Sequence, residues 1–461
     1  MPPLDGDLPT GAPGGAPRRA SPADDRGPGG ADAATDLPPA GPARAAAQRA
    51  WCLYDWGNSA FATSIVAALL PVYFAGVAGR TMPAHLATAW WGYASAAAML
   101  LAAFCGPLLG AIADRLGRRV PVLVGCVAVG AGATALLAAA PAGDWRALLL
   151  LFGVGFVAFA AANVLYDALL PAVAGPAEMH RVSARGFAYG YLGGGLLLAA
   201  HLALVTAPQR FGLPDAATAA RLAFASVALW WAAFTVPLVR RVRETGAPRG
   251  AAPSPLEAAR QVTRTCAGLR RRPELLRFLL AFWLYSDGIG TVVKMATVYG
   301  SEIGIGRTHL IGALLLVQLL AAPASLAFGR LARPLGPQRA VALGLAGYVL
   351  ITALAWFLSE AWHFWAIAAL VALVQGGTQA LSRSMYASLV PPERTAELFG
   401  FYSVSEKLAG VIGPLLFGLV AQAAGGGRFA VLTLLPFFLG GAWLLLTVDL
   451  ERGRRRALAE P

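Results

Sequence analysis

The chain has 461 residues, of which 57% are hydrophobic and 13% are charged, with 37 Lys and Arg residues against 24 Asp and Glu residues. Soluble domains carry about 25% charged and roughly 45 to 50% apolar residues, so this composition excludes a soluble globular protein and indicates a membrane protein with several spans. The formal net charge of +13 would suggest a nucleic-acid partner in a soluble protein, so the positions of the basic residues must decide its meaning.

The lysines, cysteines and histidines exclude further classes of protein. The two lysines, Lys294 and Lys407, do not follow a glycine, so the chain has no phosphate-binding Walker loop and is not an ATP-driven pump. Its four cysteines have no short paired spacing, and its five histidines form no metal-ligand pair. We therefore expect no disulfide framework, no metal site and no cofactor.

The membrane part begins near Trp51. Residues 1–48 are rich in Pro, Gly and Ala without an apolar run, which predicts a disordered cytoplasmic tail rather than a signal peptide. Twelve apolar stretches follow, each close to the about 20 residues that span a bilayer. Their approximate ranges are 50–76, 88–112, 120–140, 146–170, 186–206, 220–240, 276–299, 309–330, 338–358, 363–389, 398–423 and 428–448.

The distribution of cations predicts the orientation. With a cytoplasmic N-terminus, 28 of the 37 cations fall in the tails and inward loops, six in outward loops and three inside predicted helices. The positive-inside rule therefore places both termini in the cytoplasm, in a multi-pass protein of the cytoplasmic membrane. Topology accounts for the basic excess, so we expect no nucleic-acid partner.

A basic linker at 241–275 separates a six-helix bundle at 50–240 from a second bundle at 276–448, and 449–461 form a cytoplasmic tail. Apolar residues recur in this linker at every third or fourth position, which predicts an amphipathic helix on an anionic membrane surface. A flexible basic linker without lipid contact is the alternative. The apolar residues are Leu256, Ala259, Val262, Cys266 and Leu269.

The two halves repeat each other at nearly one offset. The matched pairs are Gly110 and Gly117 with Gly329 and Gly336, Pro171 with Pro391, and Tyr54 with Tyr285. Six-helix repeats that run in the same direction are the arrangement of major facilitator transporters. We expect an all-α membrane protein, with twelve transmembrane helices in two pseudo-repeated six-helix bundles.

One inward turn is similar to the signature loop between helices 2 and 3 of the major facilitator superfamily. Its residues are Gly110, Asp114, Arg115, Gly117, Arg118 and Arg119. The resemblance implies a latch that favours one orientation of the halves, and Asp114 is suited to accept hydrogen bonds at their interface. An ordinary basic turn is the alternative. In the second copy Arg333 stands where Asp114 would, so we expect no latch there.

A narrower resemblance covers nearly all the membrane part. Six blocks in order resemble the vacuole effluxer family of fungi and bacteria. They are LYDWGNSAF (53–61), VSARGFAYGYLGGGLLL (182–198), the Trp230–Trp231 pair with Pro237, LYSDGIGT (284–291), GGTQALSRS (376–384) and AELFGFYSVSEKLAGVIGPLLFG (396–418). The resemblance implies export of amino acids or similar small metabolites, energised by a proton gradient.

Polar residues inside membrane helices are costly, so they are the candidates for a substrate or proton pathway. The candidates are Asp55, Asn58, Tyr285, Asp287, Thr291, Lys294, Gln379, Arg383, Glu406 and Lys407. Structural alternatives are a solvated helix end or an N-cap for Asp55, an Asp287 to Lys294 interaction, and a structural ion pair that Glu406 and Lys407 close between the tenth and eleventh spans. Arg383 has two alternatives, extension to the inward interface or pairing with an acid of another helix.

Two membrane aspartates, Asp55 and Asp167 in repeated LYD sequences, also raise the possibility of an intramembrane aspartyl protease. Twelve spans and duplicated halves do not suit such an enzyme. A receptor that kept a transporter fold without transport is the other alternative. We expect a monomeric secondary transporter in the lipid bilayer that moves a small-molecule substrate by alternating access with coupled protons, and not an enzyme.

Overall fold

The computed structural model describes residues 37, 41–78, 82–141, 143–244 and 254–459. These residues form helices and connecting turns without any strand. Twelve of the described helical segments are long and apolar enough to cross a membrane. The twelve-helix, all-α fold expected from the sequence is confirmed.

The first half has six spans. They are α1 (Pro42–Ala60), continued by π-helical turns and α2 (Leu70–Tyr73), then α3 (Ala84–Leu116), α4 (Arg119–Ala139), α5 (Trp145–Ala168), α7 (Met179–Thr206) and α8 (Ala216–Arg241). A short helix, α6 (Leu170–Val173), follows α5. The first helix begins at Pro42, so residues 42–48 are helical although the sequence places them in the tail. Proline is favoured at the first helical position, and the alanines that follow are strong helix formers.

The second half repeats this arrangement with one interruption. Its spans are α10 (Pro273–Glu302), α11 (Arg307–Leu335), α12 (Pro337–Trp356), α13 (Ala361–Leu389), the pair α14 (Thr395–Leu408) and α15 (Ile412–Ala424), and the pair α16 (Gly427–Val431) and α17 (Leu435–Leu446). The eleventh span is therefore broken between Leu408 and Ile412, where the sequence pattern predicts a continuous helix. Two further helices are α9 (Pro255–Gly268), between the halves, and α18 (Leu450–Ala459), after the last span.

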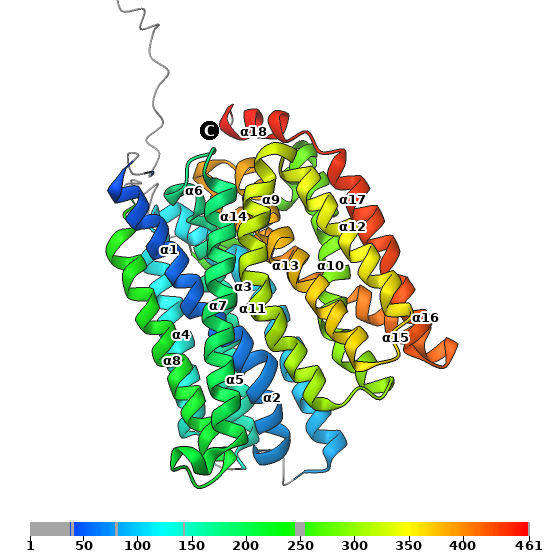
Figure 1. The fold of residues 1–461 in the computed structure, drawn as a ribbon. Coiled ribbons are helices and arrows are strands. Elements are labelled where there is room, and N and C mark those ends of the chain that lie inside the picture. The colour runs from blue at the N-terminus through cyan, green and yellow to red at the C-terminus, as the bar shows by residue number, and fades with distance from the viewer. Residues whose placement is uncertain (1–36, 38–40, 79–81, 142, 245–253, 460–461) are drawn as a thin grey trace, which may run out of the picture. The chain divides into compact units, whose positions relative to one another are not determined.

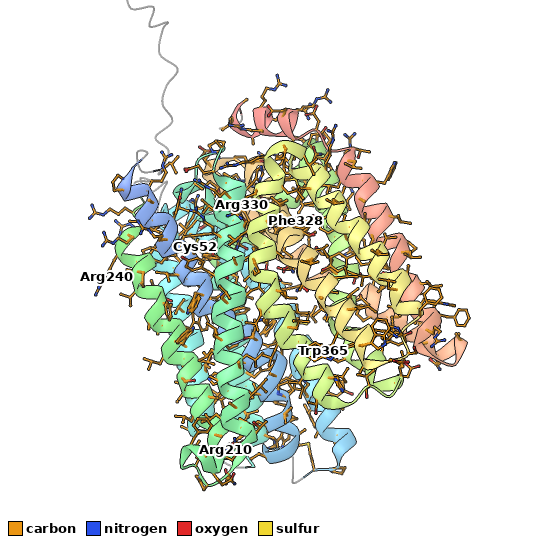
Figure 2. The ribbon with its side chains drawn as sticks, viewed as in Figure 1. Cys52, Arg210, Arg240, Phe328, Arg330 and Trp365 are labelled. Atoms are coloured by element: carbon orange, nitrogen blue, oxygen red, sulfur yellow. The ribbon has the colours of Figure 1, made fainter. Side chains whose placement is uncertain are left out.

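The start of α1 and helix α18 lie at the same end of the bundle, which we call the terminal end (Figure 1). The opposite end is the far end. Arg210 lies at the far end and Arg330 toward the terminal end (Figure 2). The even number of spans predicts that both termini lie at one end of the bundle, as observed for the start of α1 and for α18. The predicted topology also places Arg210 on the side opposite to the termini and Arg330 on the side of the termini.

The halves pack together through a few close helix contacts. Helix α14 packs on α3, and α11 and α13 pack on α7. A side chain at Gly110 would overlap the backbone carbonyl of Ala396, and one at Gly400 would overlap the backbone of Pro107. Small residues permit such close crossings in membranes. These glycines therefore set how closely α3 and α14 approach each other.

Candidate functional site

The signature turn of the first half binds the start of a helix in the second half. The buried carboxylate of Asp114 accepts hydrogen bonds from the backbone N–H of Ala396 (3.1 Å) and of Glu397 (2.8 Å) in the first turn of α14. Arg119 Nε donates to the same carboxylate at 3.0 Å, and Arg119 Nη2 donates to the Pro392 carbonyl at 2.8 Å. The N-terminus of a helix attracts negative charge, so Asp114 caps α14 from the opposite half.

The other residues of the turn shape and surround this contact. Gly117 ends α3 in the left-handed conformation, with φ of 61°. The Arg115 guanidinium lies 4.0 Å from the Glu257 carboxylate of α9, while Arg118 is exposed. The sequence-predicted turn therefore does reach the second half, and the contact depends on Asp114 and Arg119.

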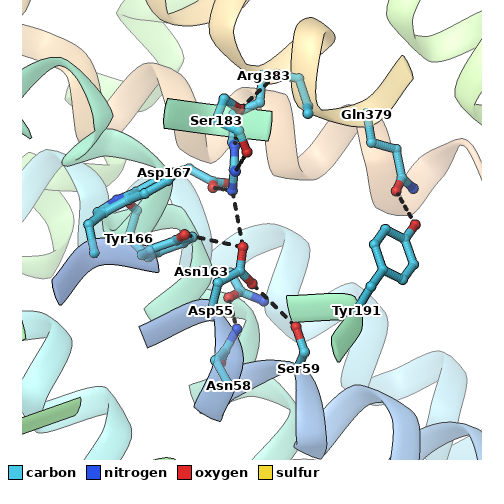
Figure 3. Close-up of polar contacts among 12 residues, drawn as sticks. Asp55, Asn58, Ser59, Asn163, Tyr166, Asp167, Ser183, Tyr191, Gln379 and Arg383 are labelled. Carbon is cyan, nitrogen blue, oxygen red and sulfur yellow. Dashed lines mark hydrogen bonds and ion pairs between the residues drawn. The ribbon is translucent and has the colours of Figure 1, made fainter. Parts of the chain in front are cut away.

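A second contact between the halves is centred on Arg383 of α13, which inserts among the helices of the first half (Figure 3). Its Nη1 donates to Asp167 Oδ1 at 2.9 Å. Its Nε donates to the Ser183 hydroxyl and its Nη2 to the Ser183 carbonyl, both at 3.0 Å. Arg383 is 3% exposed, so it pairs with an acid of another helix and does not extend to the interface.

Asp55 lies beside this guanidinium. Its Oδ2 is 3.8 Å from Arg383 Nη1 and accepts a hydrogen bond from the Tyr166 hydroxyl at 3.1 Å. Its Oδ1 accepts from the Ser59 hydroxyl at 3.2 Å. The residue is 8% exposed and lies inside α1, so the alternatives of a solvated helix end and of an N-cap for Asp55 are wrong.

Aromatic rings enclose the guanidinium on its open faces. The Arg383 Cζ atom lies 4.3 Å from the ring centroid of Phe187 and 4.7 Å from that of Trp51. Trp51 in turn stacks on Tyr166, with ring centroids 4.4 Å apart. Cation–π contacts stabilise a cation withdrawn from water, so the rings hold Arg383 in place.

The charges of this cluster do not balance. Two carboxylates, those of Asp55 and Asp167, face the single guanidinium of Arg383. Arginine stays protonated in proteins, so the cluster carries one excess negative charge when both acids are ionised. Buried charges need a partner, so a proton or another cation is required for balance.

The cluster forms part of the wall of a cavity of about 330 Å³ between the halves. This volume is within the usual range for small-molecule sites. The cavity is lined mainly by α10, α13 and α14 of the second half, with contributions from α3, α5 and α7 of the first. Its charged and amide side chains are Asp167, Lys294, Gln375, Gln379, Arg383, Glu406 and Lys407, and Tyr285 and Tyr402 also line it.

Several sequence-predicted candidates meet in this cavity. Gln379 accepts a hydrogen bond from the Tyr191 hydroxyl at 3.1 Å, which links the two halves (Figure 3). The Tyr285 and Ser382 hydroxyls are 2.6 Å apart. Lys407 Nζ donates to the Ser403 hydroxyl at 2.5 Å. Within the described residues neither Lys407 nor the exposed Glu406 takes part in an ion pair, so the pair predicted between the tenth and eleventh spans is wrong, and both side chains line the cavity.

Asp287 and Lys294 are placed differently from each other. Asp287 is fully buried and does not line the cavity, and its Oδ1 accepts from the Gly413 backbone N–H at 3.0 Å. Lys294 Nζ donates to the Gly410 carbonyl at 3.0 Å. The Thr291 hydroxyl donates to the backbone carbonyl of Asp287. No ion pair joins Asp287 to Lys294 within the described part of the chain.

These contacts bind the two helix ends on either side of the interruption between α14 and α15. An anionic side chain faces the first turn of α15, and a cationic side chain binds a carbonyl just beyond the end of α14. Each charge complements the dipole of the helix end that it contacts. Asp287 and Lys294 therefore fix the broken span from the neighbouring helix α10.

The remaining candidate, Asn58, belongs to the interior of the first half. Its Nδ2 donates to Asn163 Oδ1 at 2.6 Å (Figure 3). Sequence reasoning missed the roles of Asp167, Ser183 and Tyr191 in the site. Asp167 carried a usable signal, because it ends the second LYD sequence, but it was considered only for a protease. Among the described residues no cluster of three His, Cys, Asp or Glu side chains could hold a metal ion.

Comparison with known proteins identifies related transporters. A family model described as "Vacuole effluxer Atg22 like" matches residues 85–458. The chain is 36% identical over 406 residues to the "Uncharacterized MFS-type transporter YxiO" of Bacillus subtilis (strain 168), covering 88% of this chain and 95% of that protein. It is 28% identical over 305 residues to "Autophagy-related protein 22-1" of Aspergillus niger, covering 60% of this chain. The chain spans about half the length of that fungal relative, 48%.

Solved structures share the fold. The human organic anion transporter MFSD10 matches with a TM-score of 0.69 and 21% identity, covering 88% of this chain and 100% of that one. The transporter FucP in its outward conformation matches with a TM-score of 0.66 and 12% identity, covering 88% and 98%. At these identities the likeness shows the fold alone, that of major facilitator transporters. Both sets of relatives are transporters, which confirms that the chain is not an enzyme.

Proposed function

The chain belongs to the vacuole effluxer family of major facilitator transporters, and from this premise we propose that it exports amino acids or similar small metabolites in exchange for protons. The pairing of Arg383 with Asp167 and Asp55 at the cavity wall carries the proposal. This cluster joins the two halves and lies at the cavity wall. Its one excess negative charge can be neutralised by a proton. A single group of residues is therefore able to link substrate, proton and conformation.

The cavity suits a small zwitterion. Glu406 and Asp167 are available to bind an ammonium group, and Lys294 and Lys407 are available to bind a carboxylate. Gln375 adds an amide that donates and accepts hydrogen bonds. A site with both signs of charge favours a ligand that also carries both, because each charge is then paired away from water.

The positions of the contacts between the halves support alternating access. Asp114 closes the terminal end by capping α14, and Arg383 bonds the halves beside the cavity. Opening toward the terminal end requires both contacts to break, as in rocking of two bundles around a central site. Protonation of Asp167 would weaken its bond to Arg383 and so favour that opening.

The proposed orientation places both termini and the 241–275 linker in the cytoplasm of a cell whose cytoplasmic membrane holds the protein. It is supported by the 28 cations on the terminal side of the predicted topology against six on the other side. The terminal end is then the cytoplasmic end, and the far end opens to the outside. We propose that the monomer is the transporting unit, since the cavity is built within one chain.

A transport screen tests this function. Proteoliposomes that contain the purified protein are assayed with a panel of amino acids, with and without an imposed pH gradient. We expect at least one amino acid to accumulate only with the gradient, and Arg383→Gln to abolish this accumulation. Arg333→Gln is the matched control, because Arg333 is an exposed arginine of the same half. Uptake of panel compounds that ignores the gradient would refute the coupling, and the absence of any uptake would refute the substrate class.

A further inference from the structure

A second cavity, of about 580 Å³, lies at the terminal end, and we propose that it binds a phosphate-bearing anion. Three parts of the chain build it: the end of α3, the linker helix α9 and the segment that precedes α14. Its lining residues are Arg115, Glu257, Arg260, Gln261, Arg264, Thr265 and Arg394. The site shares no residue with the central cavity.

The arginines that line this cavity outnumber the acidic side chains that pair with them. Arg394 is paired with the buried carboxylate of Glu397 at 3.1 Å, and Arg115 lies 4.0 Å from Glu257. The guanidinium groups of Arg260 and Arg264 form no hydrogen bond or ion pair with any residue in the described part of the chain. Two arginines are thus left to bind a ligand, and a concentration of one sign of charge attracts the opposite sign.

The helix that carries these two arginines is held firmly against the bundle. Gln261 Nε2 donates to Glu397 Oε2 at 2.9 Å, and the Thr265 hydroxyl donates to the other oxygen of that carboxylate. Arg394 also contacts the Thr265 hydroxyl. Part of the polar face of α9 therefore lies on α14. The sequence predicts either a helix on the membrane surface or a flexible linker, and neither prediction includes this contact with the protein.

Glu257, the one acid that the structure describes in the lining of this cavity, does not neutralise the positive charge of its arginines. Glu257 lies in the first turn of α9, and its carboxylate accepts from the Ser254 backbone N–H at 2.9 Å. This hydrogen bond lowers the pKa of Glu257, so the side chain stays ionised and remains committed to the helix start. Arg260 and Arg264, one turn apart on α9, then line the cavity, and no carboxylate among the described residues lies within ion-pair distance of either guanidinium.

These features select the ligand class. Guanidinium groups bind phosphate oxygens through paired, charge-assisted hydrogen bonds, and a site with several arginines prefers a multiply charged anion. The cavity is large enough for a phosphate group with an organic body. The phosphate could belong to an anionic lipid headgroup at the membrane surface or to a soluble metabolite, and the experiment below separates these sources.

Such a ligand would act on the conformation of the transporter. Arg115 directly follows Asp114, and Arg394 directly precedes the helix that Asp114 caps. An anion bound by Arg260 and Arg264 would lie in the cavity that Arg115 and Arg394 also line, beside the latch between the two halves. Its binding would therefore stabilise the arrangement that is closed at the terminal end.

The test measures binding and needs no transport assay, so its outcome is independent of the proposed function. The purified full chain in neutral detergent is titrated with pyrophosphate at constant ionic strength, with thermal unfolding and calorimetry as readouts. The double variant Arg260→Gln, Arg264→Gln removes the free arginines. The control Arg270→Gln, Arg271→Gln removes the same charge from exposed residues that follow on the same linker and do not line the cavity.

We expect pyrophosphate to raise the unfolding temperature of the parent and the control, and to bind the first double variant about tenfold or more weakly. In a second arm the proteins are placed in phosphatidylcholine vesicles with or without phosphatidylglycerol. Stabilisation by phosphatidylglycerol alone, lost in the first variant only, would identify a lipid headgroup as the source. No stabilisation in either arm, or equal losses in both double variants, would overturn the proposal.

Discussion

Arg383 of α13 donates a hydrogen bond of 2.9 Å to Asp167 at the end of α5, so a cation from the second half is held by an acid of the first half. The acid is 20% exposed through its side chain and lines the central cavity. A group that holds the halves together is thus within reach of whatever occupies the cavity. The predictions below start from this geometry.

Asp167→Asn should abolish gradient-driven accumulation while leaving substrate exchange. The amide still accepts a hydrogen bond from Arg383, but it cannot take up or release a proton, so binding survives and coupling does not. Accumulation and exchange in proteoliposomes, with and without a pH gradient, measure the two activities.

Asp287→Asn is the matched control for this variant. Asp287 is also a buried acid of a membrane span, but it contacts the Gly413 backbone and does not line the cavity. The amide oxygen of Asn can still accept the hydrogen bond from the Gly413 N–H, so we expect this variant to fold and to accumulate substrate as the parent does. Loss of coupling in Asp287→Asn with retention in Asp167→Asn would reverse the assignment.

Asp114→Asn should impair turnover more than folding. The change removes a negative charge from the start of α14 and from its pair with Arg119, which is worth about 1 to 3 kcal/mol to the state closed at the terminal end. Expression and unfolding temperature should stay close to the parent, whereas the transport rate should fall several-fold. Arg118→Gln, at an exposed position of the same turn, provides the control. Normal turnover in Asp114→Asn would exclude a latch.

Gly400→Ala should destabilise the packing of α14 on α3. The added methyl group would overlap the backbone of Pro107, and backbone atoms do not move aside as side chains do. Overpacking of this kind costs about 1 to 3 kcal/mol, which thermal unfolding in detergent would detect. The control Gly418→Ala lies in the same span, where an added methyl meets no atom within 4 Å. Equal unfolding temperatures of the two variants would contradict the close contact.

Labelling of single cysteines in a background without the four native ones tests the orientation. A cysteine at Thr263, exposed on α9 at the terminal end, should resist an impermeant reagent in intact cells. A cysteine at Gln209, exposed beside Arg210 at the far end, should react. The reverse pattern would show that the termini lie outside.

Spans and signature turn could be predicted because their signals are local. About twenty apolar residues in a row indicate a helix in lipid, and the motif from Gly110 to Arg119 lies in one short stretch of sequence at the end of α3. The partners of Arg383 could not be predicted, because Asp167 and Ser183 lie about 200 residues away and sequence spacing does not report which helices touch. Hydropathy likewise does not report the break in the eleventh span. The two sides of that break are bound by Asp287 and Lys294 of a neighbouring helix.

The repeat between the halves gives the bond of Arg383 to Asp167 a further meaning. In the alignment that pairs Pro171 with Pro391, Tyr166 matches Tyr386, but Arg383 matches Asn163 and Asp167 matches Ala387. A molecule built from two identical copies of the first half would present amides where the guanidinium now lies, and two copies of the second half would lack the acid. The bond of Arg383 to Asp167 therefore joins two different surfaces. It requires that the two bundles differ in sequence at these positions while they share a common fold.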